Sequence, residues 1–209
     1  MHGSAFFFKG LLIGFSIAAP VGPIGLLCIQ RTIAYGRKSG LVTGLGAATA
    51  DGLYGAVAAF ELTTISGFLV GQQFWFRLVG GTFLLYLGAK AFLSRPTEEA
   101  ATSNHESLFS DYGSTVFLTI TNPMTILSFA AVFAGLGLAG SGGGHAAAAL
   151  MIAGVVVGSA LWWFVLSAGV SLFQAKFSSN SLRFVNSLSG AILIGFAVFA
   201  FASLLRKAK

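Results

Sequence analysis

The residue best placed to do chemistry in this sequence is an aspartate inside a long apolar segment. Asp51 is the only Asp, Glu, Lys or Arg between residues 39 and 60. In the hydrocarbon of a membrane a charged side chain costs at least about 2.5 kcal/mol, so it normally faces protein or water rather than lipid. A carboxyl group held there can bind and release a proton, and it can bind the amine of a small solute. We therefore predict that Asp51 belongs to a substrate or proton site.

Helical spacing predicts the direction in which Asp51 points. Bulky residues such as Leu53 and Phe60 lie on the opposite face of a helix through this segment. Six small residues lie within about 60° of Asp51, and Tyr54 borders their stripe: Gly40, Gly44, Ala47, Ala48, Gly55 and Ala58. Small residues mark helix contacts in membranes, so Asp51 is expected to face protein, with Tyr54 one turn away as a potential donor. The alternative is a purely structural aspartate bonded to a neighbouring helix.

Two proline-containing sequences predict broken helices. Pro20 and Pro23 lie in the first apolar segment, with Gly22 between them. A proline inside a helix removes one N–H donor and clashes with the carbonyl four residues back, and the carbonyls freed at such a break can bind a cation or an ammonium group. Asn122 and Pro123 repeat the device later in the chain, because the residue before a proline is disfavoured in helical geometry. The alternative for both sequences is a kink that serves only packing.

These residues need helices that are long enough to cross a membrane. Of the 209 residues, 56% are hydrophobic and 9% are charged, whereas soluble proteins carry roughly 25% charged residues. A membrane span needs about 20 predominantly apolar residues, and the chain offers six such segments: 5–30, 39–62, 74–94, 112–138, 146–173 and 183–205. We predict an all-α integral membrane protein with six transmembrane helices, of which the first and fourth are broken at proline.

The longest and most polar connection, residues 95–111, separates two similar halves. Each half, 1–94 and 112–209, contains three predicted spans and opens with a proline-containing one. An odd number of spans per half places the two halves in opposite orientations in the membrane. Such inverted repeats are typical of secondary transporters, whose substrate sites lie at broken helices near the middle of the bilayer.

Charge and the remaining reactive residues exclude several other classes of protein. The net charge is +6, but the basic residues lie near the ends of spans, where they anchor and orient the helices, so we expect no nucleic-acid partner. We place Arg31 in the first connection, 31–38, and expect Gln30 and Arg77 to be interfacial anchors. The single Cys28 and three scattered histidines give no disulfide or metal site, and no cofactor is expected. A stripe of small residues, Gly36, Gly40 and Gly44, is compatible with a homodimer.

Taken together, these motifs resemble those of the LysE/RhtB family of amino-acid exporters. Pro20-Val21-Gly22-Pro23 is similar to the family's P-x-G-P, Gly40, Gly44 and Gly46 lead to Asp51 as in the family, and Asn122-Pro123 is similar to its Asn-Pro-Lys. The sequence departs from the family at Met124, which stands in place of that lysine, so the cationic partner of the second break is absent. The resemblance implies export of amino acids driven by the proton gradient.

We therefore predict a secondary transporter that exports amino acids or related small metabolites, coupled to protons, from a multi-pass position in the lipid of the inner (plasma) membrane. A metal-cation exporter is an alternative, although it would need more buried acidic or soft ligands than one Asp and one Asn. A membrane scaffold without transport is another. We do not expect an enzyme, because aspartyl proteolysis needs two paired carboxylates and only Asp51 lies deep in a predicted span.

Overall fold

The computed structural model describes residues 3–20, 22–59, 68, 71–93, 108–122, 125–126, 128–129, 144–174 and 179–207. Within these ranges the chain forms helices and no strands, which confirms the all-α prediction. The helices are α1 (Gly3–Ala18), α2 (Pro23–Tyr35), α3 (Arg37–Ala59), α5 (Gln73–Leu93), α6 (Leu108–Thr121), α8 (Gly144–Gln174) and α9 (Ser179–Lys207).

Three of these helices are long and apolar enough to cross a membrane on their own. They contain the segments Phe74–Leu93, His145–Phe173 and Arg183–Leu204. A fourth span is possible if α1 and α2 count as one broken helix, since the two meet at an angle of 78°. By length and composition the described residues therefore provide up to four spans, and the arrangement of six spans in two inverted repeats stays a prediction.

The two prolines of the first segment play different parts in the break between α1 and α2. α1 ends at Ala18, and the Ala19 N–H still donates to the Phe15 carbonyl at 3.0 Å. Pro20 lies in the turn that follows, while Pro23 is the first residue of α2. Proline suits that position because the first N–H of a helix has no partner within the helix and the fixed φ of proline is already helical.

α6 also ends where the sequence predicted a break. Its last residue is Thr121, and Asn122 lies outside the helix with its N–H donating to the Thr119 carbonyl at 3.2 Å. The Asn122 carbonyl in turn accepts hydrogen bonds from the N–H groups of Thr125 and Ile126. Asn122 therefore joins α6 to a further turn of chain. Pro123 and Met124 lie outside the described residues.

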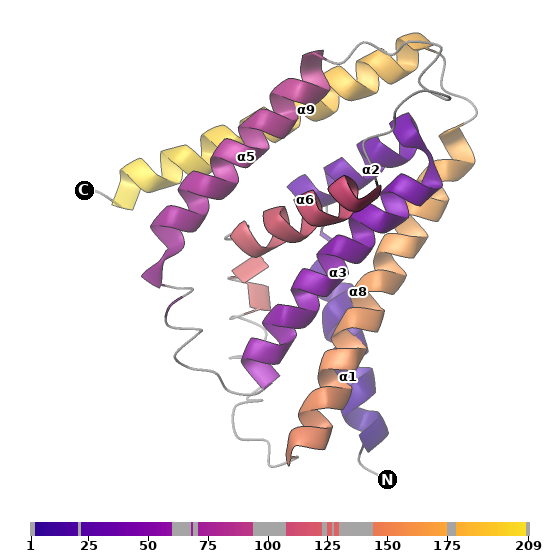
Figure 1. Cartoon of the computed structure of the whole chain (residues 1–209), viewed down its shortest axis with the longest axis vertical. Helices are drawn as coiled ribbons and strands as arrows, with labels where there is room; N and C mark the ends of the chain where they lie inside the picture. The colour runs from indigo at the N-terminus through magenta and orange to yellow at the C-terminus, as the bar shows by residue number, and fades with distance from the viewer. Residues whose placement is uncertain are drawn as a thin grey trace.

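The helices pack mainly in pairs (Figure 1). α1 runs beside α8 and α5 runs beside α9, while α3 contacts both α8 and α6, and α2 contacts α3, α8 and α9. Glycines permit the closest of these contacts. A Cβ added at Gly88 would lie 2.9 Å from the Gly190 carbonyl oxygen, and one at Gly190 would lie 2.6 Å from that of Gly88. The backbones of α5 and α9 thus touch directly, as small residues allow in membranes.

Candidate functional site

A cavity of about 270 Å³ lies at the break between α1 and α2. Five of the predicted site residues line it: Pro20, Gly22, Pro23, Asp51 and Asn122. Of the other two, Pro123 lies outside the described residues, and Tyr54 does not line the cavity. The fold therefore brings the buried aspartate, the first break and Asn122 together around one space.

Asp51 faces the interior of the protein, as the helical spacing predicted, and is 4% exposed. Its Oδ2 accepts a hydrogen bond of 2.6 Å from the Ser159 hydroxyl, which itself accepts one of 3.1 Å from Nε1 of Trp163. Because an indole N–H can only donate, the proton of Ser159 must point toward Asp51. Ser159 and Trp163 thus orient the carboxyl group from α8.

The other oxygen of Asp51 is available to the cavity. Among the described residues Asp51 accepts no second hydrogen bond, and no fully buried side-chain oxygen there lacks a partner. Oδ1 is therefore the oxygen that borders the space. Among the described residues, no three His, Cys, Asp or Glu side chains lie close enough together to bind a metal ion.

Small residues on α3 bring α8 close enough to place Ser159 beside Asp51. A Cβ on Gly44 would overlap Cβ of Trp163, and a Cβ on Gly52 would lie 2.5 Å from Cγ2 of Val156. The same small face of α3 that indicated an inward Asp51 therefore also fixes the distance between α3 and α8.

The ends of two helices meet in the cavity. Ile17 and Ala18 at the end of α1 line it, and so do Pro23, Ile24 and Gly25 at the start of α2. The last carbonyls of a helix carry partial negative charge, and its first N–H groups carry partial positive charge. No side chain caps the start of α2, so the first-turn N–H groups of Ile24 and Gly25 can bind an anion. The cavity thus offers a negative end, with Asp51, and a positive end.

The Tyr54 hydroxyl donates to a backbone carbonyl rather than to Asp51 in this structure. The acceptor is the Ile120 carbonyl at 2.6 Å, and the ring of Tyr54 stacks on Phe129 with centroids 5.5 Å apart. Because a phenol has a single proton to donate, Tyr54 cannot also donate to Asp51. Its contacts instead fix α3 to the end of α6, next to Asn122.

Comparison with known proteins places this arrangement in a family. The model of the LysE type translocator family matches residues 15–203, which include every described residue of the cavity. The chain belongs to the LysE type translocator family. It is a transport protein of the membrane, and its family is not one of enzymes.

Curated relatives of this translocator come from two bacteria. YcgF of Bacillus subtilis strain 168, a "putative amino acid efflux protein", is 26% identical over 198 residues, which cover 92% of this chain and 93% of YcgF. The uncharacterized membrane protein YahN of Escherichia coli K12 is 27% identical over 81% of this chain and 77% of its own. YrhP of Bacillus subtilis, also an uncharacterized membrane protein, is 24% identical over 83% and 87%. No solved structure shows a significant match.

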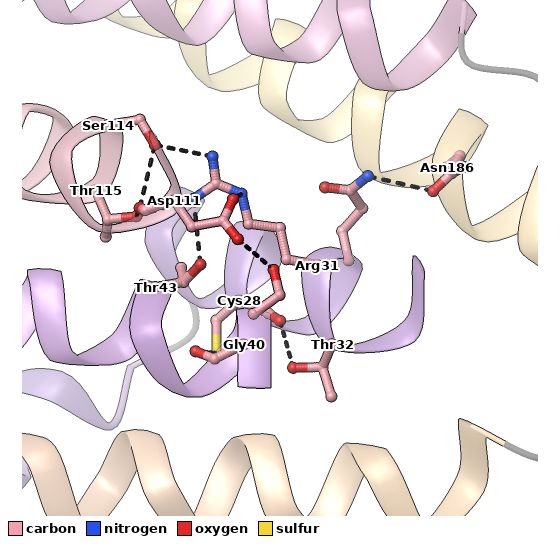
Figure 2. Close-up of polar contacts among 11 residues, drawn as sticks. Cys28, Arg31, Thr32, Gly40, Thr43, Asp111, Ser114, Thr115 and Asn186 are labelled. Atoms are coloured by element: carbon pink, nitrogen blue, oxygen red, sulfur yellow. Dashed lines mark hydrogen bonds and ion pairs between the residues drawn. The ribbon is translucent and has the colours of Figure 1, made fainter. Parts of the chain in front are cut away.

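A buried ion pair at the other end of α2 was not predicted (Figure 2). Nε of Arg31 lies 3.1 Å from Oδ1 of Asp111, and the two side chains are 5% and 2% exposed. The Asp111 Oδ2 also accepts a hydrogen bond of 2.5 Å from Ser39. The remaining guanidinium nitrogens of the translocator's Arg31 donate to neutral oxygens: Thr43 Oγ1, Thr115 Oγ1, Ser114 Oγ and the Asp111 carbonyl. We call these residues the Arg31 cluster.

The sequence contained a signal that the helix continues past Arg31. α2 ends at Tyr35, and Gly36 follows it with a φ of 92°. This left-handed backbone conformation favours glycine and commonly ends helices. The prediction that the first span ends at Gln30 and that Arg31 lies in a connection is therefore wrong. Arg31 lies instead inside the last turns of α2, and Asp111 lies in the first turn of α6.

Gln30 is also buried rather than interfacial. Its Nε2 donates to Oδ1 of Asn186 on α9 at 3.3 Å, and both residues are 7% exposed. Together with the Arg31 cluster, this bond fixes the far end of α2 to α3, α6 and α9. The start of α2 is thereby directed into the cavity.

Proposed function

We propose that this translocator exports small zwitterionic α-amino acids, or closely related metabolites, in exchange for protons across the inner membrane. The observation that carries the proposal is that Asp51, the end of α1 and the uncapped start of α2 line the same cavity. The similarity to YcgF, which is described as an amino acid efflux protein, agrees with an amino acid as the solute.

The two ends of the broken helix would bind the two charges of the substrate. The ammonium group would lie between Asp51 and the last carbonyls of α1, and the carboxylate would accept hydrogen bonds from the N–H groups of Ile24 and Gly25. Secondary transporters commonly use half-helix N-termini in this way for anionic groups, and unwound carbonyls for cations. Asn122, which also lines the cavity, would add an amide.

Asp51 would couple the substrate to the proton. An ionised carboxylate attracts an ammonium group, whereas a protonated one does not, so substrate and proton would compete for the same oxygen. A carrier of this kind moves the two in opposite directions. Ser159 can donate to Asp51 in both charge states, because its proton already points there.

The contacts between helices support two inverted repeats of three spans. If the first three spans exchange places with the last three, the contact of α1 with α8 becomes that of α6 with α3. Both of these pairs occur. The counterpart of α2 would follow Asn122 and Pro123, in a part of the chain that lies largely outside the described residues. Rocking of one half against the other would expose the cavity alternately to each side of the membrane.

The glycine stripe behind the expected homodimer is used inside the chain. A Cβ on Gly40 would overlap Thr32, and one on Gly44 would overlap Trp163. These residues pack α3 against α2 and α8, so they do not provide a surface for a second copy. The homodimer stays a prediction that rests on no described contact.

Counterflow of radiolabelled amino acids into proteoliposomes tests the proposal. Asp51→Asn keeps the shape of the side chain but removes its charge, and a hydrogen bond to a charged group contributes about 1.5–3 kcal/mol. Counterflow at low substrate should therefore fall roughly 10- to 100-fold. Thr49→Val is the matched control, because Thr49 lies exposed on α3 and its loss should leave counterflow unchanged.

Two results would overturn the proposal. One is equal counterflow by wild type and Asp51→Asn. The other is transport of radiolabelled manganese, but of no amino acid, by the wild type, which would favour a metal-cation exporter instead.

A further inference from the structure

A second cavity adjoins the first on the side of α5 and α9. Its volume is about 390 Å³. Three residues line both cavities: Pro23, Asn122 and Phe196. The second cavity therefore lies next to a solute that is bound in the first cavity, at the break between α1 and α2.

The walls of the second cavity are mainly apolar. They include Gly80, Gly81 and Leu84 of α5, Leu118 of α6, and Phe199 and Ala200 of α9. None of the described lining residues is acidic. An apolar group that moves from water into such a space gains about 25 cal/mol per Å² of buried surface.

Three polar side chains of this cavity already make hydrogen bonds within the protein. The Thr121 hydroxyl donates to the Phe117 carbonyl at 2.9 Å, and the Ser203 hydroxyl donates to the Ala200 carbonyl at 2.6 Å. Ser203 accepts a hydrogen bond of 3.2 Å from Arg77, which lines the cavity near the start of α5. Arg77 is the only charged residue among the described lining residues, and its positive charge disfavours a cationic side chain.

We infer that the second cavity receives the side chain of the substrate, and that the translocator therefore prefers neutral amino acids with apolar side chains, of the size of leucine or phenylalanine. The inference rests on the proposed function, because it needs the ammonium and carboxylate groups to be held in the first cavity. Phe196, which lines both spaces, would contact the Cβ region of the substrate.

Substrate selectivity in proteoliposomes tests the inference. Wild-type protein should exchange leucine and phenylalanine at least about tenfold better than alanine, since one methylene in an apolar pocket discriminates roughly 10- to 200-fold. Lysine and aspartate should be exchanged more weakly than leucine.

Two variants with matched controls change the size of the cavity in opposite directions. Leu84→Ala enlarges it and should raise the ratio of phenylalanine to leucine transport several-fold, while Ala200→Val narrows it and should lower that ratio. Leu85→Ala and Ala202→Val change exposed neighbours on the same two helices and should leave the ratio unchanged. A ratio within one preparation is insensitive to the amount of folded protein.

The outcomes separate the inference from the proposed function. Amino acid exchange without preference for apolar side chains, or with preference for lysine or aspartate, overturns the inference alone. The inference alone is also overturned if Leu84→Ala changes the lipid dependence or the stability of the protein but not the ratio of phenylalanine to leucine transport. That result would indicate a lipid chain in the cavity. Absence of exchange for every amino acid overturns both.

Discussion

The Arg31 cluster makes a strong prediction about stability, because its charges are almost completely buried. Asp111 is 1% exposed. Replacing Arg31 by Gln keeps the hydrogen bond from the Ser39 hydroxyl to the Asp111 carboxylate but removes the guanidinium group of Arg31. Removing one partner of a buried pair typically costs about 3–5 kcal/mol. For a chain of this size, 3 kcal/mol corresponds to a decrease in Tm of at least roughly 6 °C.

An exposed arginine two residues after the end of α2 serves as the control. Arg37 is exposed, and its guanidinium lies 4.9 Å from the ring centroid of Phe164. Such a contact contributes about 0.5–1 kcal/mol at an exposed site, so Arg37→Gln should lower Tm only slightly. Thermal unfolding in detergent micelles, followed by circular dichroism, measures both variants.

A double variant tests whether the loss comes from the unpaired charge. Arg31→Met combined with Asp111→Leu removes both charges, and such apolar replacements of buried pairs are often neutral or stabilising. The double variant should therefore be more stable than Arg31→Gln. Equal stability of Arg31→Gln and Arg37→Gln would refute the reasoning. So would a double variant whose loss of stability equals the sum of the losses measured for Arg31→Met alone and Asp111→Leu alone.

Two further predictions concern the contact of α3 with α8. Ser159→Ala removes the hydrogen bond that orients Asp51 and should raise the KM for counterflow several-fold. Trp163→Phe removes only the indole donor to Ser159 and should raise the KM less. Equal KM values in the wild type and both variants would contradict this order. Gly44→Val should destabilise the fold by about 1–3 kcal/mol through overpacking against Trp163, whereas Gly169→Ala, where an added Cβ meets no atom within 4 Å, should unfold at or above the wild-type temperature.

The sequence predicted the direction of Asp51 and the position of the first break, because local patterns decide both. The small residues around Asp51 indicated its inward direction, and two prolines three positions apart indicated the break. The consequence of Pro23 was only partly predicted. We treated it as a helix breaker that frees carbonyls, but proline is also well suited to the first position of a helix, and Pro23 begins α2. The positive end of the cavity follows from that second property.

The partners of the buried charges could not be predicted from local patterns. Ser159 is 108 positions from Asp51, and Asp111 is 80 from Arg31, so each contact depends on how distant helices pack. The position of Arg31 was missed for a simpler reason. We ended a span before the first charged residue, whereas the helix continued to the glycine that could adopt its terminal conformation.

Proton movement that accompanies the substrate tests the central role of Asp51 most directly. Proteoliposomes that contain a pH-sensitive dye should show a change of internal pH when a gradient of the best transported amino acid is imposed across wild-type protein, with protons moving against the substrate. Asp51→Asn should show no such change, while Thr49→Val should behave like the wild type. Substrate flux without proton movement in the wild type, or the same proton movement in Asp51→Asn, would contradict exchange at this carboxyl group.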